Sequence, residues 1–235
     1  LSPDGTAVQF AYERGGQAPA LFAVGPRQLS DGASSFWDRL KAGFTFQPPI
    51  TQGIEVTDWQ GSLAPRLKGR PLDLRQGTSL CLAATPDRSG FLIGTNNTLW
   101  HFDAAGARRW ALRTPAAVWG VNTDGRLAAA AIGDGTIRWY RLADGAELLA
   151  LFPHPDRRRW ILWAPSGYYD ASPGGEDFIG WHVNNGPDRA ADFFPISRFR
   201  AAFFRPDVVD RVLATLDVDQ ALRLANAVEG RRFTE

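Results

Sequence analysis

Up to about residue 195, the chain alternates short apolar runs with turns that contain glycine, proline, aspartate or asparagine. The runs include SLCLAAT, GFLIGT, TLWHF, RLAAAAIG and TIRWYRL. Short apolar or alternating segments between turn residues are typical of β-strands. Residues 136–142 show the strand period clearly, because Ile137, Trp139 and Arg141 share one face and the residues between them share the other. This pattern predicts an all-β architecture.

The turn and strand-end patterns recur along the chain. Similar strand ends occur at residues 56–61, 99–106, 137–145 and 179–186, roughly 40 residues apart. Such a period, with about four strands in each unit, is typical of β-propeller blades. The four alanines at 128–131 fit a crowded inner strand. A short buried helix is the alternative, since alanine is the best helix former, although the glycines that follow favour a strand.

Residues 133–152, GDGTIRWYRLADGAELLALF, resemble the second half of a WD-repeat blade. That family usually carries Asp-Gly before the third strand, an aromatic-Asp pair at its end, and a glycine-containing hairpin into the outer strand. Here Tyr140 and Arg141 stand where Trp-Asp is expected, and the preceding Gly-His pair is absent. The resemblance extends over about residues 50–190, and more weakly over 1–49. It implies a partial WD-repeat-like β-propeller of about four to five blades.

The pattern changes after residue 195. Apolar residues with helical spacing on one face follow Pro206 and Asp207, which suit a first helical turn: Val208, Val209, Val212, Leu213 and Leu216. A second helix is expected to begin near Asp217 or Asp219 and to stop by Gly230, with Ala221, Leu222, Leu224, Ala225 and Val228 as its apolar face. We therefore predict propeller blades over residues 1–194 and a helical tail or linker over 195–235.

Residues 160–213 resemble the end of the propeller in large bacterial WD-repeat proteins, several of which also carry a caspase-like peptidase domain. This resemblance implies that residues 167–186 form the final blade and that the following helices lead away from it. It supplies no catalytic residue, since a caspase-like domain needs its own Cys and His in a different α/β fold. The chain starts at Leu1 and contains no methionine, so we expect it to be a fragment. Missing blades would come from upstream chain, another polypeptide or a symmetry-related copy.

Charge and composition narrow the choice of partners. The 26 basic and 25 acidic residues leave a formal charge of +1, which gives no long-range attraction to nucleic acid or to an anionic membrane. No apolar run is long enough for a membrane span, and the first residues do not resemble a signal peptide. The single cysteine, Cys81, excludes an internal disulfide framework and favours a reducing compartment. We therefore expect a cytoplasmic protein.

The stretch 167–195 holds the candidate chemistry: Asp170, Glu176, Asp177 and His182, with Asp188 and Asp192 further on. Two carboxylates could act as general acid and base if the fold brought them into one cleft. The blade alignment instead places residues 168–170 and 178–182 in strands and residues 172–177 in the hairpin between them. An acidic, solvated turn is therefore the favoured interpretation.

For the remaining histidines, the cysteine and the tryptophans, the sequence favours a structural role over a chemical one. His101, His154 and His182 have no local ligand spacing, and Cys81 lies in an apolar strand without a neighbouring histidine. Trp100, Trp139 and Trp181 occupy similar places in successive repeats, which favours packing between blades over an aromatic ligand cage.

We expect no catalytic residue, cofactor or metal in these residues. The predicted function is a non-catalytic scaffold that binds a protein partner or regulates an attached effector domain in a larger bacterial protein. The alternatives are a purely structural spacer and a ligand-binding or hydrolytic propeller that uses the acidic residues of 170–192.

Overall fold

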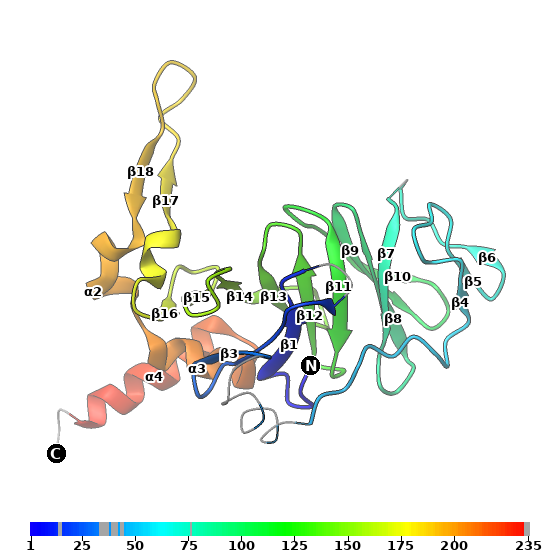
Figure 1. The fold of residues 1–235 in the computed structure, drawn as a ribbon, viewed down its shortest axis with the longest axis horizontal. Coiled ribbons are helices and arrows are strands. Elements are labelled where there is room, and N and C mark those ends of the chain that lie inside the picture. The colour runs from blue at the N-terminus through cyan, green and yellow to red at the C-terminus, as the bar shows by residue number, and fades with distance from the viewer. Residues whose placement is uncertain (14–15, 33–37, 39–41, 43–44, 76, 233–235) are drawn as a thin grey trace. The chain divides into compact units, whose positions relative to one another are not determined.

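The computed structural model describes residues 1–13, 16–32, 38, 42, 45–75 and 77–232. They divide into two compact units, an N-terminal unit (Leu1–Leu148) and a C-terminal unit (Leu149–Glu235). The chain is mostly antiparallel β-sheet, and helices follow near its C-terminus (Figure 1). The predicted all-β fold class with a helical tail is confirmed. The boundary between the compact units falls within β14 (Glu147–Pro153), and a domain division near residue 195 stays a prediction.

The N-terminal unit begins with a three-stranded antiparallel sheet. Its strands β1 (Ala7–Ala11), β2 (Pro19–Ala23) and β3 (Gln28–Asp31) pair in chain order. One face of the sheet is apolar, and Phe46 from a later segment packs against Ala7, Leu21 and Ala23. Sequential strands joined by short connections form a meander, the pairing of a propeller blade.

The second sheet is a complete four-stranded meander (Figure 1). It contains β7 (Ser79–Ala84), β8 (Gly90–Thr95), β9 (Thr98–Asp103) and β10 (Arg108–Arg113), each paired with its neighbour in the sequence. Every residue of β8 is buried, as expected for a strand inside a sheet that is covered on both faces. This sheet has the strand order of a propeller blade.

The next strands repeat this arrangement. β11 (Val118–Thr123), β12 (Leu127–Ile132) and β13 (Ile137–Arg141) pair in order, and a turn at residues 141–146 leads into β14. The alanine run lies in β12, so the strand prediction for it is confirmed and the helix alternative is wrong. A small sheet of β4 (Val56–Thr57), β5 (Arg66–Leu67) and β6 (Arg70–Pro71) completes the strands of this unit.

A shared apolar core joins the β7–β10 sheet to the β11–β13 strands. It includes Cys81, Leu92, Val118 and Ala130, and the Cys81 thiol lies 3.3 Å from the Val118 carbonyl oxygen. Gly94 permits this close approach, because a Cβ there would lie 2.5 Å from the Cys81 Sγ. The prediction that Cys81 is a core residue agrees with its 8% exposure.

The buried thiol gives a testable pH dependence. Burial raises the pKa of Cys81 to about 12, whereas an unfolded thiol has a pKa of about 8.5. The thiol of the folded state keeps its proton, so its contribution to stability is complete below about pH 8.5 and is lost as the pH rises above that value. We expect iodoacetamide at pH 8 to label Cys81 only after denaturation, as measured by mass spectrometry. Labelling of the native protein as fast as the denatured protein would contradict a buried thiol.

The C-terminal unit starts with the rest of β14, which pairs with β15 (Trp160–Trp163), and β15 pairs with β16 (Tyr169–Ala171). Tyr169 and Ile161 form an apolar core with Ile196 from the later, helical part of the chain. A 3-10 helix, η2 (Gly175–Phe178), follows β16.

The predicted hairpin between strands at residues 168–170 and 178–182 is wrong. Residues 172–177, expected as its turn, enter the 3-10 helix η2, which Gly174 precedes in a left-handed conformation at φ 77°. The following strand, β17 (Gly180–Val183), pairs instead with β18 (Asp192–Pro195) further along the chain. Trp181 is consequently 40% exposed and is not a counterpart of the buried Trp100 and Trp139.

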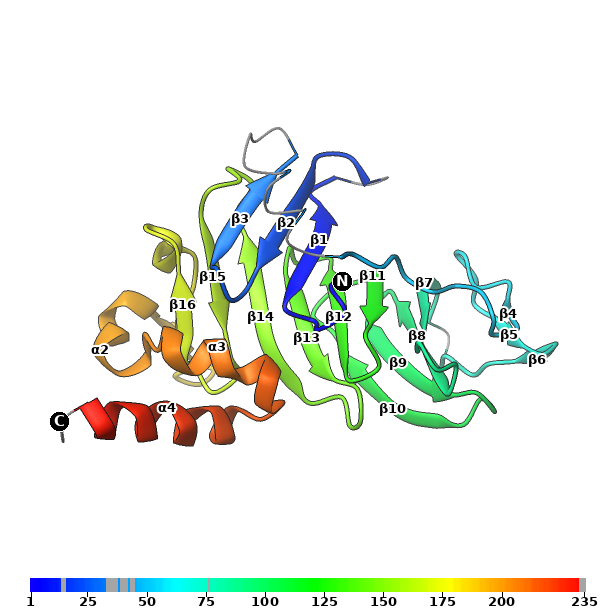
Figure 2. The same cartoon turned by 90° about the horizontal axis from the view of Figure 1, so that it is seen from below.

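Helices close the described chain. η3 (Ile196–Phe199) and α2 (Arg200–Phe203) precede α3 (Pro206–Thr215) and α4 (Val218–Arg232), and the last two lie side by side (Figure 2). The predicted face of α3 is buried through Val208, Val209, Val212 and Leu213.

The second predicted helix needs two corrections. α4 begins at Val218, as predicted, and Asp217 caps it by accepting a 2.7 Å hydrogen bond from the Gln220 backbone N–H. The helix runs two residues past Gly230, the predicted stop. Ala221 and Ala225 are buried, but Leu224 and Val228 of the predicted apolar face are exposed.

No helix within the described ranges is both long and apolar enough to cross a membrane.

Candidate functional site

The structure places the predicted acidic residues in different surroundings. Asp170 is buried in β16, where its Oδ1 accepts a 2.8 Å hydrogen bond from the Ala171 backbone N–H. Glu176 lies in η2, and its Oε1 accepts a 3.0 Å hydrogen bond from the Tyr169 hydroxyl. Arg200 forms an ion pair with the same carboxylate. Glu176 therefore links a buried tyrosine of the sheet to the start of α2.

The Tyr169 hydroxyl is held in its neutral form. Burial raises the pKa of Tyr169, and the nearby Arg200 charge opposes that rise. A protonated phenol can donate to the Glu176 carboxylate, and the carboxylate also receives the Arg200 guanidinium. The Glu176 carboxylate and the Arg200 guanidinium are thus paired at the edge of an apolar core, so their role is structural.

The other two candidates face solvent. Asp177 is exposed on η2 and His182 is exposed on β17. Among the residues that the structure describes, no three His, Cys, Asp or Glu side chains gather as a metal site would need. A ligand-binding or hydrolytic use of Asp170, Glu176, Asp177 and His182 stays a prediction.

The other two histidines pack against aromatic rings. His101 lies against Trp110 with ring centroids 5.1 Å apart, and burial lowers the pKa of His101. His154 stacks on Phe178 with centroids 4.4 Å apart and nearly parallel rings. Both contacts agree with the predicted packing role.

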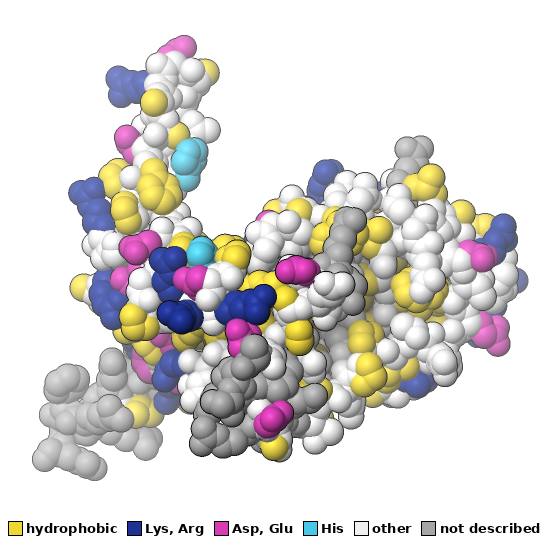
Figure 3. Space-filling model, in the orientation of Figure 1, with side chains coloured by type: hydrophobic (Ala, Val, Ile, Leu, Met, Phe, Trp, Pro, Cys, Tyr) yellow, Lys and Arg dark blue, Asp and Glu magenta, His cyan; other side chains and the backbone are white. Residues whose placement is uncertain are grey.

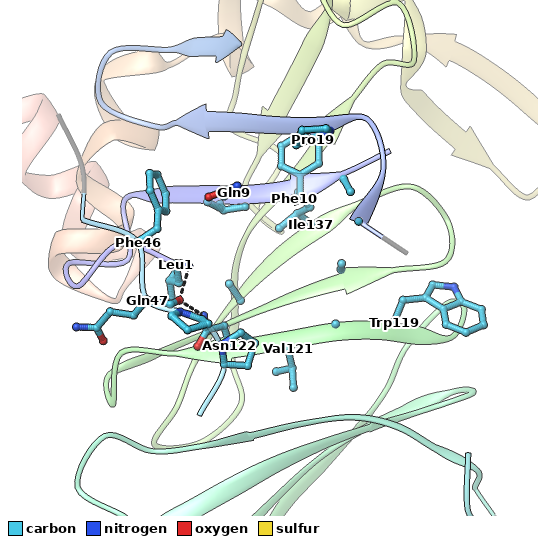
Figure 4. Close-up of a pocket in the computed structure, with 18 of the residues that line it drawn as sticks. Leu1, Gln9, Phe10, Pro19, Phe46, Gln47, Trp119, Val121, Asn122 and Ile137 are labelled. Atoms are coloured by element: carbon cyan, nitrogen blue, oxygen red, sulfur yellow. Dashed lines mark hydrogen bonds between the residues drawn. The ribbon is translucent and has the colours of Figure 1, made fainter. Parts of the chain in front are cut away.

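A pocket that sequence reasoning missed lies in the N-terminal unit, between β1 and β11 (Figure 4). Its volume is about 670 Å³. Most of its lining is apolar and includes Val8, Phe10, Phe46, Trp119, Val121 and Ile137. Among the described lining residues, polar side-chain groups come from Gln9, Glu13, Gln47, Trp119 and Asn122, and of these Glu13 is ionisable.

One end of this pocket is closed by hydrogen bonds between distant segments. The Gln47 backbone N–H donates to the Leu1 carbonyl oxygen at 3.1 Å. The Asn122 side-chain amide donates to the Gln47 carbonyl oxygen at 2.8 Å, as the dashed lines in Figure 4 show. These bonds hold residue 47 across the ends of β1 and β11.

Trp119 borders the other end of the pocket (Figure 4). The pairing of β11 with β12 shifts register between Val118 and Gly120, so Trp119 is a bulged residue and its side chain is 48% exposed. A Cβ at Gly133 would lie 3.1 Å from the Trp119 Nε1, so a glycine there leaves space for the indole. Bulges often redirect a side chain toward a functional site.

The same bulge occurs in the preceding sheet. The pairing of β7 with β8 shifts register between Ser79 and Cys81, which places Leu80 at the position of Trp119. Aligning SLC of residues 79–81 with VWG of residues 118–120 is the sequence signal that could have singled out Trp119.

A second apolar surface lies on the β17–β18 hairpin of the C-terminal unit. Trp181, Val183 and Phe193 are 40%, 44% and 59% exposed. Figure 3 shows hydrophobic side chains gathered on the lower part of this hairpin. The Trp181 ring also contacts Phe203 of α2 at a centroid distance of 5.7 Å, so part of this surface packs within the unit.

No protein-family model matches the sequence, and no curated protein matches it. Solved structures that resemble the chain include BamB from Moraxella catarrhalis, at 18% identity and TM-score 0.36 over 53% of this chain and 42% of BamB. The computationally designed Ika8 protein shows 14% identity and TM-score 0.37 over 68% of this chain and 55% of its own. The C-terminal WD40 domain of Sif2 shows 18% identity and TM-score 0.32 over 47% of this chain and 34% of its own. This chain thus spans less than two thirds of the length of each of these three proteins. The description of the sheets as propeller-type blades rests on their strand pairing alone.

Proposed function

We propose that the chain is a non-catalytic propeller-type scaffold that binds a protein partner through the pocket between β1 and β11. The observation that carries this proposal is the exposed Trp119 at the rim of a largely apolar pocket. Tryptophan is enriched among the residues that dominate binding energy at protein interfaces. Exposed apolar surface next to a concave site also favours a partner that removes it from water.

The wider setting of this scaffold is part of the same proposal. The partner is a separate protein or an attached effector domain, and the scaffold regulates that effector in a larger bacterial protein of the cytoplasm. The near-neutral formal charge of +1 supports a protein partner over nucleic acid. The resemblance of residues 160–213 to bacterial WD-repeat proteins supports the attached effector.

The substitution Trp119→Glu tests the proposal. We expect it to weaken partner binding by about tenfold or more, because it places a charge where an apolar contact is required. The matched control is Leu63→Glu, since Leu63 is 62% exposed in the same unit but does not line the pocket. The measurement is quantitative capture of the natively expressed protein from its own cells, with both variants first checked for unchanged thermal unfolding.

Two results would contradict the scaffold. One is equal recovery of every stoichiometric partner by the wild type and Trp119→Glu. The other is a small molecule retained by the wild type in native mass spectrometry, with no protein partner, which would favour the ligand-binding alternative.

A further inference from the structure

The β17–β18 hairpin of the C-terminal unit forms a sheet of its own with two outer edges. Residues 77–232 are described without a gap, and within this range β17 and β18 pair only with each other. Figure 1 shows the hairpin extending away from α2 and β16 of the same unit. A two-stranded hairpin is at best marginally stable in water, and further strands with an apolar face stabilise it. The hairpin can therefore gain stability when a strand is added to one of its edges.

The hydrogen bonds inside the hairpin determine which backbone groups of β17 point outward. The Ile196 N–H donates to the Ile179 carbonyl oxygen at 3.2 Å, directly before the first pair of the β17–β18 ladder, so the odd-numbered residues of β17 bond to β18. In an antiparallel ladder the intervening residues direct their N–H and C=O groups to the opposite side. The backbone groups of Gly180 and His182 therefore point to the outer edge of β17.

The outer edge of β18 is less suited to pairing than that of β17. Phe193 and Pro195 lie opposite His182 and Gly180, so they are the outward-pointing residues of β18. Pro195 has no N–H to donate, and Asp192 adds a charge, and both features protect strand edges from further pairing. β17, GWHV, contains no proline, carboxylate, lysine or arginine. The edge of β17 is consequently the one that can accept a strand.

The sequence around β17 is complementary to itself. In IGWHV, residues 179–183, the apolar residues Ile179 and Val183 lie two positions on either side of Trp181, so the pattern is the same in both directions. Ile179 is also extended, at φ −131° and ψ 159°, and continues the strand. Trp181 and Val183 are 40% and 44% exposed, which leaves apolar surface on this face of the strand.

Antiparallel pairing of two such strands about a two-fold axis at Trp181 matches these features. Gly180 of each copy lies opposite His182 of the other, so the outward-pointing groups exchange two main-chain hydrogen bonds in each pair. The two Trp181 side chains lie opposite each other, and Ile179 lies opposite Val183 of the second copy. Directly opposite aromatic and β-branched pairs stabilise a sheet, and no like charges meet.

We propose that the outer edge of β17 is a dimerisation surface, on which residues 179–183 pair antiparallel with the same residues of a second copy of this chain. The two hairpins form one four-stranded sheet, with the two Trp181 side chains in contact across the two-fold axis. The interface is small, and small interfaces are typical of transient, concentration-dependent assemblies. This inference goes beyond the proposed scaffold function and does not depend on the pocket of the N-terminal unit.

Sedimentation of the purified protein from about 1 μM to about 1 mM tests the dimer. We expect a reversible shift from monomer to dimer as the concentration rises. His182→Pro removes an outward N–H of β17 and spares the bonds to β18, so it should weaken dimerisation by about tenfold or more. The matched control is Phe193→Pro, which removes the outward N–H opposite it on β18 and should leave the dimer unchanged. Thermal unfolding of both variants checks that the unit still folds.

Cysteine cross-linking tests the register of the two strands. Opposite residues of a non-hydrogen-bonded antiparallel pair have Cα atoms about 4.5 Å apart, within the range of a disulfide. Trp181→Cys should therefore form a disulfide-linked dimer with oxidised glutathione, as measured by mass spectrometry. Val183→Cys is the matched control and should not, because residue 183 lies opposite Ile179. The native Cys81 is 8% exposed and should remain reduced in both variants.

Three results would overturn the proposal. The first is a wild-type protein that stays monomeric up to about 1 mM. The second is a dimer that Phe193→Pro weakens as much as His182→Pro, which would remove the assignment to the β17 edge. The third is a disulfide that forms through Val183→Cys but not through Trp181→Cys, which would exclude pairing about Trp181. None of these results affects the capture experiment with Trp119→Glu.

Discussion

Replacing Trp139 with alanine is expected to lower the free energy of unfolding of the N-terminal unit by about 3–5 kcal/mol. Trp139 lies in β13, its side chain is fully buried, and it is among the largest side chains of the core. Its Nε1 donates a 2.9 Å hydrogen bond to the Gly5 carbonyl oxygen, in the turn before β1. The indole therefore connects the third repeat to the first sheet, and alanine would leave both a cavity and an unpaired carbonyl.

Denaturant unfolding provides the measurement for Trp139→Ala, followed through the alkylation of Cys81, which belongs to the same unit. The matched control is Trp119→Ala, because Trp119 is 48% exposed and its loss should change stability by about 0.5 kcal/mol or less. Similar decreases in the free energy of unfolding for Trp139→Ala and Trp119→Ala would show that the first sheet does not pack on β13 as described.

Replacing Tyr169 with alanine should destabilise the C-terminal unit by a similar amount, about 3–5 kcal/mol. Tyr169 is fully buried in β16 and packs with Ile161 and Ile196. Its ring lies edge-on to Phe204 with centroids 5.5 Å apart, and its carbonyl oxygen accepts a 3.0 Å hydrogen bond from the Arg205 N–H. Its side chain thus packs between the sheet of this unit and its helices.

The variant Tyr169→Phe separates the ring from the hydroxyl. It keeps the packing and removes the hydrogen bond to Glu176, whose carboxylate retains Arg200, so we expect a loss of only about 1 kcal/mol. Calorimetry of both variants gives the comparison. A loss for phenylalanine as large as for alanine would mean that the Glu176 contact, and not the ring, determines the stability of this core.

Elements with a local signal could be predicted from the sequence. The alternation around Trp139 identifies β13, and the glycines after the alanine run favour a strand over a helix. Pro206 and the spacing of Val208 and Val212 identify α3. Side-chain periodicity and turn chemistry act over a few residues, so they are visible in a single sequence.

The pairing partners of strands were less predictable from the sequence than the strands themselves. The blade alignment predicts a hairpin of β16 and β17, but β17 pairs with β18 across an intervening loop. The GEDF segment of η2 carries no pattern that separates a 3-10 turn from a hairpin loop. The exposure of Trp181 follows from the β17–β18 pairing, whereas the blade alignment favours packing of Trp181 between blades.

The pocket depends on register and on contacts between distant segments. Trp119 faces the pocket because of one shifted pair in the β11–β12 ladder, and a one-residue shift in register reverses the face of a side chain. The end of the pocket is closed by Gln47 bonding to Leu1 and Asn122, which lie 46 and 75 residues away from it. The single sequence contains no signal for the two Gln47 bonds, whereas the bulge at Trp119 has a signal in the alignment of residues 79–81 with residues 118–120.

The most direct measurement of the central claim is capture of partner proteins from the native cells by the wild type, Trp119→Glu and Leu63→Glu, quantified by mass spectrometry. The account predicts that Trp119→Glu recovers a stoichiometric partner about tenfold less well than the wild type, whereas Leu63→Glu recovers it equally well, because Trp119 borders the pocket and Leu63 does not line it. Equal recovery by all three proteins would contradict a binding site at this pocket.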